Sequence, residues 1–152
     1  MPFPRGRTPR AVVLRARFLL SYVARHKWYM LLERRRHGAS WRSALTHDID
    51  KLWPDYLWLW IVRDRVEHCD RLHRARAPHH WEWWSDGGSP PRYRPMSDAA
   101  RREMLTDWWA AQRMRGARDL PAWYAGLSDP ERDRIGLHPS TRAWVAAQLA
   151  VG

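Results

Sequence analysis

The sequence predicts an all-α fold, a single helical domain of about five to seven helices that spans residues 1–152. Several segments carry apolar residues three or four positions apart, which places those residues on one face of an α-helix. No segment alternates apolar and polar residues in the way that a half-buried strand does. A chain of 152 residues is also long enough to bury one hydrophobic core.

Capping residues mark the ends of the predicted helices. Gly38 ends the first helix, because glycine readily adopts the left-handed conformation at a helix C-terminus. Ser40 is a suitable N-cap for the second helix, and Pro54 suits the first turn of the third. Gly116 closes the fourth helix, and Ser128 begins a Ser-x-x-Glu capping box before the fifth. The expected helices therefore cover residues 9–36, 41–51, 54–74, 98–115, 129–136 and 139–150, after a flexible basic N-terminus at residues 1–8.

Residues 75–95 are expected to form a long loop, because they contain several prolines and a pair of glycines. A loop of this length in a compact domain is usually functional or disordered. It carries two adjacent histidines, His79 and His80, followed by a tryptophan-rich stretch at residues 81–84. One hypothesis is a lid, in which a histidine contacts metal or phosphate and the tryptophans cover the site. The alternative is that the tryptophans attach the loop to the core while the histidines cap backbone groups.

The chain is strongly basic, with a formal net charge of +11 and an isoelectric point near 11.1. Its positive charges are arginines except at Lys27 and Lys51. Two interpretations stay open at this point. The excess could reflect a preference for arginine over lysine, or it could create a positive field that attracts an anionic substrate or nucleic acid.

Cysteine content and hydropathy indicate the cellular compartment of the protein and whether a membrane is among its partners. Cys69 is the only cysteine, which excludes an intramolecular disulfide and a cysteine-based zinc site. A reducing, cytoplasmic location is the prediction. The apolar run at residues 56–62 is too short to span a bilayer, and Arg15 and Arg17 interrupt the apolar N-terminal region. We therefore expect no membrane partner.

The most informative motif is the pair His47-Asp48, which lies in an apolar segment expected to be helical. Imidazole and carboxylate are ligands of hard and borderline divalent metals. Lys51 follows His47 by four residues, so in a helix it would share a face with it and could hold a phosphate oxygen beside the metal. The motif therefore predicts a metal site that acts on phosphate.

A second candidate region is the predicted helix that contains Glu103 and Asp107. The two carboxylates are four residues apart and share one helical face among apolar neighbours. A buried carboxylate needs a cation or hydrogen-bond donors. A metal would satisfy Asp107, and so would an arginine.

Together these residues resemble the HD-domain metal phosphohydrolases, in which a histidine, a His-Asp pair and a distant aspartate follow one another on helices. The closer resemblance is to a family of short bacterial and phage proteins catalogued as a domain of unknown function, which look like HD-domain relatives. The matching residues span about 22 to 150 in the expected order. They are His26-Lys27-Trp28-Tyr29, His47-Asp48-Ile49-Asp50-Lys51-Leu52, Pro54-Asp55, His73, His79-His80-Trp81-Glu82-Trp83-Trp84, Glu103-Met104-Leu105-Thr106-Asp107-Trp108 and Trp123-Tyr124.

The resemblance implies an HD-like helical domain and assigns roles to its residues. Lys51 matches the lysine of the family's His-Asp-x-Ser-Lys motif. The metal ligands would be His26, His47, Asp48 and Asp107. A second metal or the substrate would be bound by His73, His79 and His80.

The chain departs from the family's pattern at three positions. Asp50 stands where the family usually has serine, Ala77 where an asparagine often precedes the paired histidines, and Asp70 where a tryptophan is common. The additional carboxylate of Asp50 could strengthen cation binding or pair with an arginine.

The expected function is a metal-dependent phosphohydrolase that acts on a nucleotide or another small phosphorylated substrate. A divalent ion (Mn, Co, Mg, Ni, Fe or Zn) would activate water and polarise a phosphoryl oxygen. Asp55 or Glu103 would accept the water's proton, and Lys51 would offset the charge of the transition state. One alternative is a helical nucleic-acid-binding protein without catalysis, which places arginines on phosphates and tryptophans on bases. A catalytically inactive HD-like scaffold is another.

Overall fold

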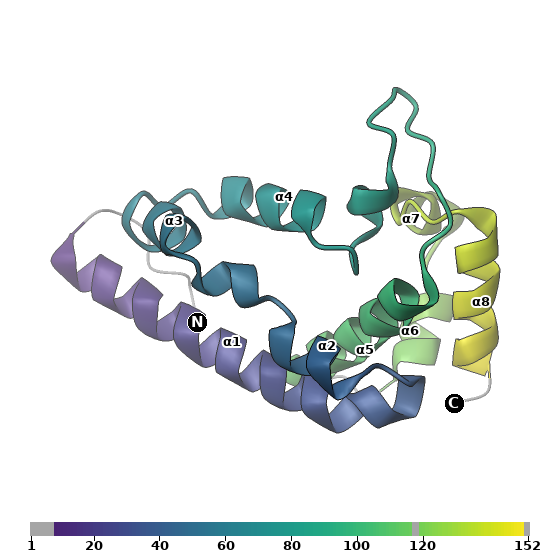
Figure 1. The fold of residues 1–152 in the computed structure, drawn as a ribbon, viewed down its shortest axis with the longest axis horizontal. Coiled ribbons are helices and arrows are strands. Elements are labelled where there is room, and N and C mark those ends of the chain that lie inside the picture. Colours follow the sequence, from purple (N-terminus) through teal and green to yellow (C-terminus); the bar gives the residue numbers. More distant parts are fainter. Residues whose placement is uncertain (1–7, 117–118, 151–152) are drawn as a thin grey trace.

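The computed structural model describes residues 8–116 and 119–150, and these residues are helical throughout apart from their connections (Figure 1). The only strand-like pairing within them is a single antiparallel bridge between Ser85 and Tyr93. The prediction of an all-α fold is therefore confirmed. Most of the predicted basic N-terminus, residues 1–7, lies outside the described residues. The helices are α1 (Pro9–His37), α2 (Trp41–Thr46), α3 (Pro54–Leu57), α4 (Val66–Arg76), α5 (Asp98–Met114), α6 (Leu120–Ala125), α7 (Asp129–Arg134) and α8 (Pro139–Ala150).

The helix α1 runs along one side of the molecule and packs mainly against α5 (Figure 1). Its buried side chains include Leu19, Val23, His26 and Met30, whose spacing of three and four residues places them on one face. Gly38 ends the helix with a φ of +69°, which glycine adopts at little cost. This buried face packs against α5 and α2, so a histidine in the middle of α1 is directed into the protein.

The predicted helix over residues 41–51 ends early, at Thr46. His47 caps α2, and Asp48 adopts the left-handed conformation with a φ of +57° before a 3₁₀ turn at Ile49–Leu52. Among non-glycine residues, aspartate is one of the few that tolerate this conformation. The expectation that Lys51 shares a helical face with His47 is therefore wrong, because no helix joins the two residues.

The predicted helix over residues 54–74 is also divided. The α3 helix passes into a π-helical turn at Trp58–Val62, and Asp64 has a φ of +57° before α4 begins. These breaks, together with α6, give more and shorter helices than the sequence predicts. A π-helical turn inserts an extra residue and redirects the chain, a feature often found beside functional sites.

The core of the described residues is built of several buried clusters, one of which joins Met30 of α1, Ala44 of α2 and Ala110 of α5. The largest joins α5, α6 and α8 and includes Met104, Leu105, Leu120 and Val145. The loop after α4 is attached to this cluster by its tryptophans, because Trp81 and Trp84 pack against it. The second cluster lies between α1 and the chain around the π-helical turn and contains Leu19, Val23, Tyr56, Trp60 and Cys69.

We expect Leu105→Ala to lower the free energy of unfolding by about 2–5 kcal/mol, because Leu105 is fully buried and its truncation leaves a cavity. The matched control is Leu32→Ala, since Leu32 is 51% exposed, and it should change stability by no more than about 0.5 kcal/mol. Urea unfolding followed by circular dichroism measures both. Equal effects of the two substitutions would contradict this core.

Candidate metal centre

Four of the predicted ligands lie together although they come from distant parts of the chain. His26 projects from the middle of α1, His47 and Asp48 occupy the turn after α2, and Asp107 lies on α5. The Nε2 atom of His26 is 2.8 Å from Asp107 Oδ1 and 3.1 Å from His47 Nε2. Asp48 Oδ1 is 3.4 Å from His47 Nε2. The two histidines and Asp48 are each no more than 5% exposed, so this group is almost closed to solvent.

The three remaining predicted histidines form a second group beside the first. His73 comes from α4, and His79 and His80 come from the loop that follows. The Nε2 atoms of His73 and His80 are 3.0 Å apart, and one ring nitrogen from each histidine lies within 4.8 Å of the others. Asp48 Oδ1 is 3.0 Å from His73 Nε2 and 3.6 Å from His79 Nε2. This oxygen therefore lies between the two groups.

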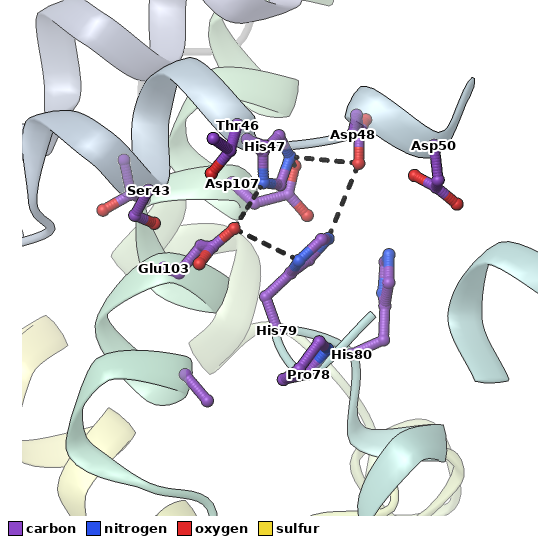
Figure 2. A network of polar contacts seen from close by, with 12 residues as sticks. Ser43, Thr46, His47, Asp48, Asp50, Pro78, His79, His80, Glu103 and Asp107 are labelled. Carbon is purple, nitrogen blue, oxygen red and sulfur yellow. Dashed lines mark hydrogen bonds and ion pairs between the residues drawn. The ribbon is translucent and has the colours of Figure 1, made fainter. Parts of the chain in front are cut away.

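Carboxylates outside the two groups orient the imidazole rings. Glu103 Oε1 lies 3.0 Å from His47 Nδ1 and 3.3 Å from His79 Nδ1, and Asp50 lies 2.8 Å from His73 Nδ1. Because an ionised carboxylate only accepts hydrogen bonds, these contacts place the ring proton on Nδ1. Where a ring is neutral, its Nε2 atom then faces the shared centre with a free lone pair. Figure 2 shows the closed circuit of four polar contacts that joins His47, Asp48, His79 and Glu103.

Two lysines hold the turn that carries His47 and Asp48. Lys27 Nζ donates to the carbonyl oxygens of Leu45 and His47, at 2.7 and 2.5 Å, and so caps the end of α2. Lys51 Nζ donates to Asp48 Oδ2 at 2.7 Å. One carboxylate oxygen of Asp48 is therefore occupied by Lys51, and the other is directed to the histidines.

The electrostatics of the first group favour ionised carboxylates. Although burial opposes ionisation, His47 and Lys51 hold the pKa of Asp48 well below its usual range, and His26 and His47 do the same for Asp107. Burial alone would lower the pKa of His47, but Asp48, Asp107 and Glu103 outweigh it and raise this pKa to about 10. Without another cation in the group, His47 therefore carries the positive charge that balances these carboxylates.

In the second group, Asp48 and Asp50 outweigh burial and raise the pKa of His73, whereas the two loop histidines have the opposite character. Burial, reinforced by the neighbouring His79, lowers the pKa of His80 to about 3. Burial and the charge on His47 lower the pKa of His79 as well. Both rings are therefore neutral near pH 7, which is the form of imidazole that binds a metal ion.

Two buried polar atoms at the centre of the site make no hydrogen bond to any described residue: Asp48 Oδ1 and His79 Nε2. The approach of His73 Nε2 to Asp48 Oδ1 is close but lacks hydrogen-bond geometry. A buried polar atom without a partner is costly. The convergent lone pairs of several Nε2 atoms and one carboxylate oxygen fit a divalent cation, which would satisfy both atoms.

The structure does not bring every predicted residue to the site. The carboxylate of Asp55 is 60% exposed, lies 4.0 Å from an Arg76 guanidinium nitrogen and lines neither cavity beside the centre, so the structure does not place this predicted proton acceptor at the site. Glu103 is present, but its two imidazole partners outweigh burial and lower its pKa strongly. It is placed to orient His47 and His79, and an acceptor with so low a pKa is a weak base.

Sequence analysis also missed residues that shape the site. It left open whether Asp50 binds a cation or pairs with an arginine, whereas Asp50 contacts His73. It gave Lys27 no role, although this lysine anchors the turn. Tyr22 was not considered, but its ring stacks on His26 with centroids 5.9 Å apart. Of these residues, only Tyr22 could have been recognised from the sequence, because it precedes His26 by four residues and so shares its helical face.

The fold and the site define an all-helical protein with a buried histidine–carboxylate cluster. The chain belongs to DUF5662, a family of unknown function, whose sequence model matches residues 56–151. The matched region contains the second group of histidines, together with Glu103 and Asp107, whereas His26, His47 and Asp48 precede it. No curated protein and no solved structure matches the chain. None of the described helices has the length and apolar character that crossing a membrane requires.

We expect the metal-free protein to lose stability as the pH rises from about 6.5 towards 10. The pKa of His47 is raised from about 6.5 in the unfolded chain to about 10 in the fold. Its protonated form therefore stabilises the fold fully below pH 6.5, and this stabilisation is lost as the pH approaches 10. Urea unfolding in the presence of a chelator measures the effect.

The matched control for this pH dependence is His47→Gln, which removes the titrating group. Its unfolding free energy should start lower and fall less between pH 6.5 and 10 than that of the wild type. Parallel pH profiles for the two proteins would show that His47 does not carry the dependence.

Proposed function

We propose that this protein is a metal-dependent phosphohydrolase of the HD type, acting on a nucleotide or another small phosphorylated compound. The observation that carries the proposal is the position of Asp48 Oδ1, a buried oxygen without a hydrogen bond that lies between two groups of histidines. The order of His26, the pair His47-Asp48 and Asp107 also resembles the HD pattern.

The residues present can be divided between two divalent ions. The first would be held by His26, His47, Asp48 and Asp107, and the second by His73, His79 and His80 with Asp48 as the shared ligand. Bound ions of this kind polarise a phosphoryl oxygen and lower the pKa of a coordinated water. Among the described residues, the ligand atoms of His26, His47 and Asp107, and those of the three later histidines, each lie close enough for one ion.

The side chains around the centre would position a phosphate. Lys51 lines the cavity of about 410 Å³ beside the centre, and Asp48 outweighs burial and raises its pKa, so it stays protonated. Its positive charge would stabilise the negative charge that develops on a phosphoryl group. Tyr22 lines the same cavity, and burial raises its pKa, so its hydroxyl keeps its proton and can donate a hydrogen bond to a phosphate oxygen.

Substitution of Asp48 and Lys51 should separate metal binding from turnover. Asp48→Ala removes the oxygen shared by both groups, so we expect it to lower metal content and abolish hydrolysis. Lys51→Ala removes a charge but no ligand, so the protein should keep its metal and lose about 10- to 100-fold in turnover. Asp55→Ala is the matched control, because Asp55 is exposed and lines neither cavity beside the centre, and it should leave both quantities unchanged.

Elemental analysis and phosphate release from a panel of phosphoesters, with Mn, Co, Mg and Ni supplied in turn, measure these outcomes. Undiminished hydrolysis by a folded Asp48→Ala protein would remove this aspartate from the mechanism. No hydrolysis by metal-loaded wild type across the panel would contradict the proposed activity.

One observation favours the second candidate, a nucleic-acid-binding protein. Residues 1–47 carry eleven of the 27 basic residues but only one of the 16 acidic residues, Glu33, so almost all of the net charge of +11 lies in this part of the chain. Arg17, Arg25 and Arg35 are exposed on α1 and form no ion pair with any described residue. Trp28, which is 60% exposed, lies on the same side of the helix and could stack on a base.

If α1 binds single-stranded nucleic acid, replacing Arg17, Arg25 and Arg35 together by glutamine should weaken binding and make it less sensitive to salt. Each lost phosphate contact reduces the slope of log K against log salt by about 0.7. The matched control replaces three arginines that pair within the fold, Arg101, Arg132 and Arg142. Fluorescence anisotropy with a labelled oligonucleotide measures both triple variants. Equal losses in the two, or no binding at low salt, would contradict this second candidate.

A further inference from the structure

The cavity beside the candidate metal centre has lining residues that the proposed chemistry does not use. This cavity of about 410 Å³ is lined in part by residues of the centre, including His26, Asp48 and Asp107. The lining also includes several aromatic rings and Gln112. A cavity of this size is typical of a site for a small molecule.

One wall of the cavity is a series of stacked rings along α1. His26, Tyr22 and Phe18 are each four residues apart, so they lie on one face of the helix. The Tyr22 ring stacks on His26 with centroids 5.9 Å apart and on Phe18 at 6.4 Å. Phe18 lies parallel to Trp60 at 6.2 Å. The wall therefore leads from a candidate metal ligand to a flat aromatic surface.

A second wall is formed by α5, which packs against α1. Asp107, Trp108 and Gln112 follow one another on one face of this helix, and all three line the cavity. Trp123 packs edge-on against Trp108, with centroids 5.9 Å apart, and also lines the cavity. The rise of an α-helix places Gln112 about 7.5 Å from Asp107 along the axis. The hydrogen-bonding side chain of Gln112 thus lies on the same helix as Asp107, a short distance from the candidate metal centre.

No hydrogen bond within the described residues accounts for the burial of the Gln112 side chain. Its residue is only 6% exposed, and its side-chain amide makes no hydrogen bond to any described residue. Its atoms are not sealed in the core either, since it lines the cavity. An amide offers a donor and an acceptor side by side, and the edges of nucleobases carry the same adjacent pair. A ligand with such an edge would complete the hydrogen bonds of Gln112.

We propose that the part of the cavity around Gln112 binds the base of a mononucleotide, with Gln112 hydrogen-bonded to the base edge and the aromatic side chains of the lining stacked on its faces. The inference rests on the proposed function, which places the phosphate at the metal centre, and it narrows the substrate to phosphoesters that carry a nucleobase. The positive charges of Lys51, Arg74 and Arg115 around the cavity suit such an anion. A sugar phosphate alone would leave the amide and the aromatic surfaces unused.

The first test compares hydrolysis of the four nucleoside 5′-monophosphates with that of ribose 5-phosphate, which lacks a base. Gln112→Ala should raise KM for the preferred nucleotide about tenfold, the loss of one good base contact, and leave kcat nearly unchanged. Hydrolysis of ribose 5-phosphate should not respond. Gln112→Glu keeps the size of the side chain but removes its donor, so it should change which base is preferred. The matched control is Gln148→Ala, since Gln148 lies on α8 and does not line the cavity.

The second test does not depend on catalysis. The four nucleosides, without phosphate, should quench the fluorescence of the cavity tryptophans in the wild type and the Gln148→Ala protein, and Gln112→Ala should weaken that binding. If ribose 5-phosphate is hydrolysed as well as any nucleotide and Gln112→Ala alters neither KM nor nucleoside binding, the base site is overturned while the phosphohydrolase stands. If no phosphoester is hydrolysed but nucleosides bind through Gln112, the base site is supported and the proposed activity fails.

Discussion

The site depends on the buried carboxylate of Asp48 and on the left-handed backbone that directs it. A φ of +57° ends α2 and points the side chain inward, where Lys51 occupies one oxygen and three imidazole nitrogens surround the other. An unpaired charge in this environment would destabilise the fold, so the surrounding cations and donors are required. Lys27 fixes the turn by bonding the carbonyl of His47. The contacts of Lys27 and Lys51 therefore offset both the cost of the left-handed turn and the cost of burying the carboxylate.

The rest of the architecture brings other side chains to this carboxylate. The crossing of α1 and α5 sets His26 against Asp107, and α4 presents His73 from the opposite side (Figure 1). The loop after α4 contributes His79 because its tryptophans are packed against the main core. The tryptophans attach the loop to the core as the alternative to the lid hypothesis expects, but the histidines contact other side chains of the cluster instead of capping backbone groups. Because the family match begins at residue 56, α1 and the turn after α2 supply their ligands from outside the matched region.

Sequence reasoning predicted the helical class and the candidate ligands more fully than the local geometry. Asp107 could be proposed because its spacing from Glu103 on a helix is visible in the sequence, and His26 because the order of residue types resembles the HD pattern. The break after Thr46 could not be predicted, because a left-handed aspartate is stabilised by tertiary contacts rather than by local propensity. Asp55 was expected to be a carboxylate near the metal, whereas its side chain is exposed and lies beside Arg76. Gln112 had no signal at all, since only packing shows that its amide faces a cavity.

Anomalous diffraction from crystals grown with Mn²⁺ tests most directly whether this cluster is a metal centre. A centre of two ions should give one peak about 2.0–2.3 Å from Nε2 of His26 and His47, and a second beside the Nε2 atoms of His73 and His80. The peaks should lie about 3.5–4 Å apart, with Asp48 Oδ1 between them. A map without a peak in the cluster, in crystals whose side chains are arranged as described, would contradict a metal centre. The protonated His47 would then be the permanent counter-charge of a purely structural network.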